Sequence, residues 1–129
     1  MDYGMFLPVQ QAAVAAVMGD QSCVEATRKA YQRRRDLLCE GFSSIGWNME
    51  KPSSTMFVWA PVPPTYTSSE AFVLALLEKA GVLVTPGSAF GPSGEGFVRL
   101  ALVQDEVSIQ KAVAAVQQAA ILVRSIFIV

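Results

Sequence analysis

The chain of 129 residues contains no histidine, and only two of its residues are cysteine. The first absence removes the usual general base and the commonest metal ligand. The thiols, Cys23 and Cys39, fall in one predicted helix, where a rise of about 1.5 Å per residue separates them by roughly 24 Å. They cannot pair with each other, and two thiols this far apart hold no metal ion. We therefore expect free thiols and no metal site.

Excess charge is also lacking, because the formal net charge is only -1. Nucleic acids and anionic membrane surfaces both require clustered positive charge, so we expect neither partner. The basic cluster Arg33-Arg34-Arg35 is flanked by acidic residues and is interpreted as a solvated helix face. Free thiols and the lack of a secretory leader favour a cytoplasmic location.

Long apolar runs are missing as well. Residues 119–129 are strongly apolar but are interrupted by Arg124 and Ser125. They also fall short of the roughly 20 residues that a membrane span needs. We expect no membrane span, and we interpret this tail as a helix end that packs on protein.

What the chain does contain is apolar even for a globular protein, with 52% apolar and 16% charged residues, which excludes a disordered or fibrous class. Its length suits one domain, residues 1–129, with a hydrophobic core. The first half predicts an apolar helix over residues 9–18 that begins near Pro8. A second, long helix follows, opened by a capping box of Ser22 and Glu25 and closed by Gly46.

The second half predicts a strand over residues 56–60, which the following prolines end. Thr67 and Glu70 form a second capping box, and Gly81 closes the helix that it opens. Strands are expected at residues 82–85 and 97–103, and a last helix begins at Asp105. This order lacks regular βαβ alternation, so it predicts an α+β fold with helices packed on a small, mainly antiparallel sheet.

Arg99 is the most informative single residue, because it interrupts the apolar run FVRLALV. Strand alternation places it on the same face as Phe97 and Ala101. A half-buried guanidinium without an acidic partner is costly, and its planar fork matches a carboxylate with two parallel hydrogen bonds. The alternative is an arginine on the wet face of an edge strand. Sequence pattern alone leaves both open.

The loop PGSAFGPSGEG before this strand is rich in glycine, which lets backbone approach a ligand closely. It is equally a plain turn, and no Gly-Lys-Ser/Thr follows it, so it is not a phosphate loop. The lysines lie on polar helix faces or beside a proline, and none is predicted to be a desolvated Schiff-base lysine. They are Lys29, Lys51, Lys79 and Lys111.

The segment GVLVTPGSAFGPSGEGFVRLALV, residues 81–103, closely resembles the carboxyl-terminal signature of class I/II aminotransferases of fold type I. DYGMFLPVQQAA, YQRRRDLL and STMFVWAPVP are similar to further parts of that family's small domain. The resemblance implies that Arg99 binds the α-carboxylate of the substrate and that Phe57 lines the substrate pocket. The same resemblance names no catalytic, cofactor-binding or metal-binding residue on this chain.

By the same resemblance, residues 1–129 are the small domain of a dimeric enzyme that uses pyridoxal phosphate. That enzyme moves an amino group between an amino acid and a 2-oxo acid. Its large domain, which holds the cofactor, is expected to be absent from this chain, and the chain alone is expected to be inactive and to hold no cofactor. Donors such as aspartate, alanine, aromatic amino acids or diaminopimelate stay open. The alternatives are a non-catalytic small-molecule-binding or interaction module, or an inert truncation.

Overall fold

The computed structural model describes residues 4–122. Contacts divide the chain into two compact units, Met1–Ala30 and Tyr31–Val129, and the long helix α2 (Ser22–Ser44) begins in the first and ends in the second. Within the described residues, no helix is both long and apolar enough to cross a membrane. The interpretation of the tail concerns mainly residues 123–129, which lie outside the described part.

The first unit contains helix α1 (Leu7–Met18), which has Pro8 in its first turn as predicted. None of its residues is buried. The predicted capping box of Ser22 and Glu25 is wrong. Helix α2 begins at Ser22 itself, whose backbone N–H donates to Oδ1 of Asp20 at 2.9 Å. Asp20 therefore accepts the hydrogen bond from the Ser22 N–H that the capping box assigned to the Glu25 side chain. The Glu25 N–H donates to the Gln21 carbonyl oxygen at 3.2 Å and not to the Ser22 hydroxyl.

The second unit is built on a sheet of three antiparallel strands in the order β1-β3-β2 within the described residues. The strands are β1 (Phe57–Pro61), β2 (Thr85–Pro86) and β3 (Phe97–Ala101). The predicted α+β class with a small antiparallel sheet is confirmed. Strand β2 is shorter than predicted, and β1 includes Pro61, which an edge strand tolerates.

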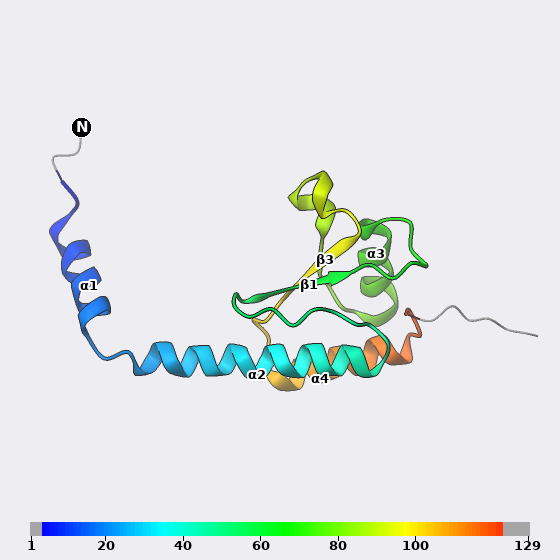
Figure 1. Cartoon of the computed structure of the whole chain (residues 1–129), viewed down its shortest axis with the longest axis horizontal. Helices are drawn as coiled ribbons and strands as arrows, with labels where there is room; N and C mark the ends of the chain where they lie inside the picture. Colours follow the sequence, from blue (N-terminus) through cyan, green and yellow to red (C-terminus); the bar gives the residue numbers. More distant parts are fainter. Residues whose placement is uncertain (1–3, 123–129) are drawn as a thin grey trace, which may run out of the picture. The chain divides into compact units, whose positions relative to one another are not determined.

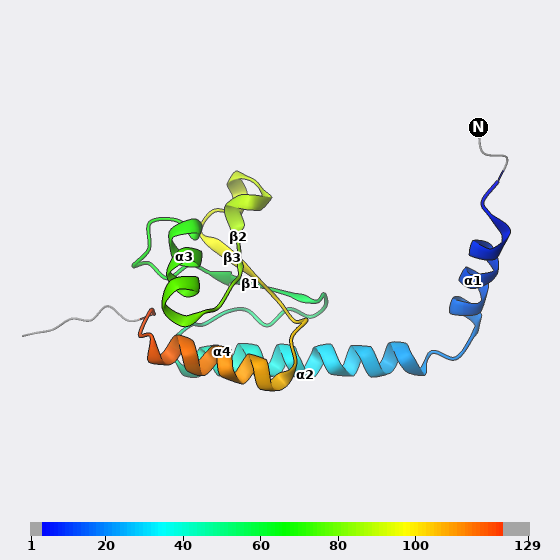
Figure 2. The same cartoon turned by 180° about the vertical axis from the view of Figure 1, so that it is seen from behind.

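Three helices cover one face of this sheet: α2, α3 (Ser69–Ala80) and α4 (Glu106–Gln118). Figures 1 and 2 show α2 and α4 side by side in both views, with the loop after β2 at the far side of the sheet. At their contact, a Cβ on Gly41 would lie 2.9 Å from a methyl group of Val113. The core joins sheet and helices through Leu38, Phe42, Val58, Phe72, Leu76, Val98, Leu100, Ile109 and Val116.

The helix ends follow the sequence signals only in part. The hydroxyl of Ser68, not Thr67, accepts a hydrogen bond from the Ala71 N–H at 3.1 Å, so the predicted cap of α3 was placed one residue too early. Gly81 ends α3 with φ of 66°, a left-handed conformation that glycine adopts freely. Asp105 caps α4 through the Ser108 N–H at 2.7 Å, as predicted.

Candidate functional site

The two faces of the sheet differ sharply in what they carry. Along β1 and β3, every second residue points into the core, including Val58, Ala60 and Val98. The alternate residues form the open face: Phe57, Trp59, Phe97, Arg99 and Ala101. This confirms the predicted alternation around Arg99. The edge-strand alternative is wrong, because β3 is the central strand and Arg99 pairs with Trp59 on one side and Thr85 on the other.

Arg99 is held between two aromatic rings. Its guanidinium carbon lies 4.2 Å from the ring centre of Phe57 and 4.6 Å from that of Phe90. These distances suit cation–π contact, in which the negative face of a ring attracts the cation. The side chain that sequence analysis assigned to carboxylate binding and the one assigned to the substrate pocket are thus in direct contact.

The same guanidinium has an unsatisfied donor. Its Nε is the buried side-chain nitrogen or oxygen in the described residues that has no hydrogen-bond partner. An orphaned buried donor costs about 1–3 kcal/mol, and more when it is charged. An anionic group placed against Arg99 would remove this cost, and a carboxylate has the geometry to do so.

Phe90 is presented by the glycine-rich loop, which forms two short 3-10 helices, η1 (Gly87–Phe90) and η2 (Pro92–Gly94). The two turns pack backbone to backbone. A Cβ on Gly87 would overlap the carbonyl oxygen of Gly94, and a Cβ on Gly94 would overlap that of Gly87. The glycines therefore serve close backbone approach within the loop itself, which fixes how the loop presents Phe90.

Glu95 ties this loop to the start of α3. Its carboxylate accepts hydrogen bonds from the Ser69 N–H at 2.7 Å, the Ser69 hydroxyl at 2.9 Å and the Gly96 N–H at 3.0 Å. The hydrogen bond from the Ser69 backbone is the main reason that the pKa of Glu95 lies below its ordinary value. The position also suits a negative charge, because a helix N-terminus carries partial positive charge.

We expect Glu95→Gln to destabilise the chain by an amount that depends on pH. A carboxyl group whose pKa is lowered by folding stabilises the folded state above its ordinary pKa of 4.5, and this contribution is lost as the pH falls through the lower folded-state value. The difference in unfolding midpoint between parent and variant should be constant near neutral pH and shrink below about pH 4.5.

Thermal unfolding from pH 3 to pH 7 measures this difference. The matched control is Glu78→Gln, because Glu78 is an exposed glutamate within α3, the helix whose N-terminus Glu95 contacts, and caps no helix end. A difference that stays constant down to pH 3 would show that the Glu95 carboxylate does not anchor the loop.

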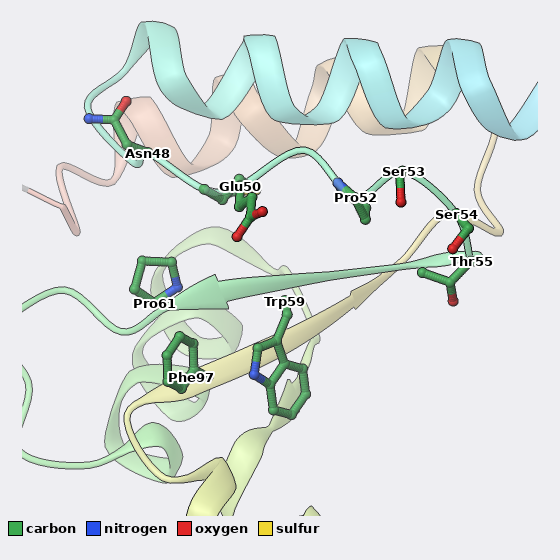
Figure 3. A pocket seen from close by; sticks show the side chains of 10 residues that line it. Asn48, Glu50, Pro52, Ser53, Ser54, Thr55, Trp59, Pro61 and Phe97 are labelled. Carbon is green, nitrogen blue, oxygen red and sulfur yellow. The ribbon is translucent and has the colours of Figure 1, made fainter.

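A groove of about 680 Å³ lies beside β1, between that strand and residues 48–55 (Figure 3). Trp59 and Phe97 point to the same side of β1 and form part of its wall, while Glu50 extends from the loop toward the strand. The two rings stack at 6.0 Å with an angle of 12° between their planes. The groove thus shares aromatic residues with the open face, but Arg99 does not line it.

The loop that borders the groove is held by α2. Arg35 donates to the Pro52 carbonyl oxygen at 3.0 Å and pairs with Asp36 at 2.8 Å, and Lys51 lies 3.2 Å from Asp36 and 3.0 Å from Glu40. The interpretation of the arginine run as a solvated face is therefore only partly right. Of the three arginines, Arg33 has a mainly exposed side chain, whereas Arg35 is largely buried and positions this loop.

Residues 3–116 match the family "Aminotransferase class I and II". The chain belongs to this family. It is 48% identical over 113 residues to LL-diaminopimelate aminotransferase of Moorella thermoacetica, which covers 88% of this chain and 29% of that enzyme. It is 44% identical over 114 residues to glutamate-pyruvate aminotransferase AlaC of Escherichia coli, covering 87% and 28%.

Solved structures of the family share the fold. The substrate-bound structure of BacF from Bacillus subtilis superposes with a TM-score of 0.81 at 40% identity, over 89% of this chain and 30% of that one. The chain thus spans about 30% of the length of the aminotransferases that it matches.

Class I and II aminotransferases work with pyridoxal phosphate bound to a lysine, and the lysines here do not fit that role. A Schiff-base lysine must lose its proton, which requires a lowered pKa. Hydrogen bonds to Glu40 and then Asp36 instead raise the pKa of Lys51, and Lys29 lies 3.5 Å from Glu25. Lys79 and Lys111 are exposed. Among the described residues, no acidic or sulfur cluster suits a metal ion either.

Sequence analysis did not identify two residues of this candidate site, Phe90 and Glu95. Phe90 stands in the quoted loop, but nothing in the pattern of the loop indicates that its ring reaches Arg99. Glu95 reads as a turn residue, and its partner Ser69 is 26 positions away. The available signal was that Phe90 and Glu95 are the aromatic and the acidic residue of an otherwise small, glycine-rich loop.

Proposed function

We propose that this chain is the small domain of a pyridoxal-phosphate-dependent aminotransferase and that Arg99 binds the α-carboxylate of its substrates. The observation that carries the proposal is the buried, unsatisfied Nε of Arg99 between two aromatic rings. The substrates are amino acids and 2-oxo acids, between which an amino group moves. Both carry a carboxylate beside the reacting carbon, so one arginine serves both.

The value of Arg99 to the reaction is positional as well as electrostatic. A guanidinium that makes two parallel hydrogen bonds to a carboxylate fixes the plane of that group and the direction of the bond behind it. Holding a reactant in one orientation means that its rotational and translational entropy is lost on binding and not in the reaction step, which lowers the barrier of that step. Phe57 adds an apolar wall on one side of this site.

We assign the cofactor to a large domain like the one that the remaining length of the relatives supplies. The lysines of this chain do not fit the role of a Schiff-base lysine. The chain also spans only about 30% of the length of its relatives. We assign the Schiff-base lysine and the phosphate-binding groups to that large domain. Pyridoxal phosphate supplies the carbonyl that carries the amino group from one substrate to the next, and without the large domain we expect no activity.

Exposed apolar residues support contact with further protein. In the first unit, the exposed residues include Phe6, Val17 and Met18, at 72%, 74% and 80%. In the second unit, Trp59, Phe90 and Phe97 are 39%, 50% and 38% exposed. Exposed apolar surface of this extent marks interaction sites. We propose that the large domain and the second subunit of a homodimer pack against these exposed apolar residues. We propose a cytoplasmic location for the enzyme.

A chimera tests the proposal. In it, this chain replaces the corresponding part of the aminotransferase from Moorella thermoacetica, which supplies the large domain. We expect the chimera to bind pyridoxal phosphate and to transfer the amino group of LL-diaminopimelate, the substrate in that enzyme's name, to a 2-oxo acid. A panel of further amino donors then defines the selectivity of the site.

The cofactor absorbance band shows whether the large domain is loaded, and formation of the product amino acid shows transfer. The matched control is the chain alone with added cofactor, which should show neither. A loaded chimera that transfers no amino group from any donor would contradict the proposal.

A further inference from the structure

Phe90 occupies a position that core packing does not explain. Its side chain is 50% exposed, and it stands in a loop beyond the open face of the sheet. Burial of apolar surface therefore accounts for little of its placement. What its ring does contact is the Arg99 guanidinium at 4.6 Å and the Trp59 ring at 5.6 Å.

The ring is itself held in place from two sides. Trp59 meets it edge to face at an angle of 65°, and Trp59 stacks in turn on Phe97. The loop behind Phe90 is fixed by the backbone contact of Gly87 with Gly94. Phe90 is thus supported both by the Trp59 ring and by the closely packed backbone of its own loop.

An arginine side chain has several rotatable bonds, and it loses conformational freedom when it is held in one orientation. Bidentate carboxylate binding demands one plane of the guanidinium. Phe57 lies against it at 4.2 Å and Phe90 at 4.6 Å, so the two rings limit its movement before any substrate arrives. Arranging the group in advance lowers the cost of binding.

We propose that Phe90 is a positioning residue that holds the guanidinium plane of Arg99 ready for the substrate carboxylate. The inference rests on the proposed function of Arg99. It assigns to the glycine-rich loop a definite task in substrate binding, which is to carry the second wall of the carboxylate site. Phe57 supplies the first wall from β1.

Two substitutions in the chimera test this task. Phe90→Leu removes the ring and keeps an apolar side chain, whereas Phe90→Tyr keeps the ring. We expect Phe90→Leu to lower kcat/KM roughly 3- to 30-fold, mainly by raising KM, because a cation–π contact with Arg99 is lost. Phe90→Tyr should stay within about twofold of the parent.

A pair of donors that differ only in α-carboxylate or α-carboxamide separates positioning from a general structural role. If Phe90 positions Arg99, Phe90→Leu should lower kcat/KM for the α-carboxylate donor more than for the α-carboxamide donor. Only the carboxylate accepts hydrogen bonds from two N–H groups of the Arg99 guanidinium. Equal loss for both donors would contradict the inference. A Phe90→Leu chimera with the kcat/KM of the parent would also contradict it. So would a Phe90→Tyr chimera whose kcat/KM falls as far as that of Phe90→Leu.

Arg99→Ala in the same chimera distinguishes the two levels of the account. If Arg99→Ala lowers kcat/KM strongly while Phe90→Leu leaves it unchanged, only the positioning role of Phe90 is wrong. A small loss with Arg99→Ala overturns the carboxylate site, and with it the basis of the inference.

Discussion

Arg99→Ala should reduce kcat/KM of the chimera by roughly 30-fold to several-thousand-fold while leaving the cofactor absorbance band unchanged. The loss of a charge-assisted, bidentate contact corresponds to about 2 to 5 kcal/mol of binding energy. We expect this contact to be strong because the Arg99 Nε is buried and has no competing partner among the described residues. Steady-state kinetics with an α-carboxylate donor measure it.

Arg99→Lys should restore little of that activity. Lysine keeps the positive charge but offers a mobile point donor in place of a planar fork, so the carboxylate loses its fixed orientation. The rings of Phe57 and Phe90 lie 4.2 and 4.6 Å from the guanidinium carbon, and a lysine ammonium has no planar group to present to them. Arg33→Ala is the matched control, because Arg33 is an exposed arginine paired with Glu106. If Arg99→Ala stays within about threefold of the parent, the carboxylate role is wrong.

Phe72→Ala should lower the free energy of unfolding of the chain by about 3–5 kcal/mol, the usual cost of truncating a buried phenylalanine. Phe72 has no exposed surface, and its ring packs against Trp47 at 5.1 Å and Tyr66 at 5.0 Å. Alanine would leave a cavity between helix α3 and the sheet that these neighbours fill only in part.

Urea denaturation followed by circular dichroism measures that free energy. Leu74→Ala is the matched control on the same helix, since Leu74 is 56% exposed and should cost far less. Equal effects of the two substitutions would show that α3 does not pack with Phe72 inward. The sheet whose open face carries Arg99 would then not be supported by Phe72 of α3.

Local patterns in the sequence predicted most of this fold. Helical spacing gave the helices their approximate places, and of the predicted N-caps only Asp105 of α4 is as expected, with a hydrogen bond that spans three residues. Alternation along residues 97–101 gave the two faces of β3, because strand geometry has a period of two. These features depend on near neighbours in the chain.

Features that depend on distant partners were not predictable in this way. The capping box of Ser22 and Glu25 was wrong because Asp20 takes the Ser22 N–H and the Gln21 carbonyl takes the Glu25 N–H. Arg35 donates to the Pro52 carbonyl oxygen, 17 positions away. Strand order was likewise unknown, so an edge position for Arg99 could not be rejected from the pattern. Only the pairing of β3 with both β1 and β2 rejects it.

The candidate site was predicted in part. Arg99 stood out as a lone charge in an apolar strand, and the family resemblance added Phe57. Their contact at 4.2 Å is a result of register, because Phe57 pairs with Ala101 and so lies diagonally beside Arg99. The roles of both residues toward substrate stay predictions until measured. Phe90 escaped because a loop conformation, not a periodic element, brings its ring to Arg99.

The central claim is that Arg99 and the substrate α-carboxylate interact, and a double-mutant cycle tests it most directly. The chimera and its Arg99→Ala variant are each assayed with a matched α-carboxylate and α-carboxamide donor, and kcat/KM is compared across all four combinations. We expect the parent to prefer the carboxylate by roughly 30-fold or more, and the variant to show a preference of less than about threefold. An Arg99→Ala variant that keeps the full preference of the parent would contradict the account.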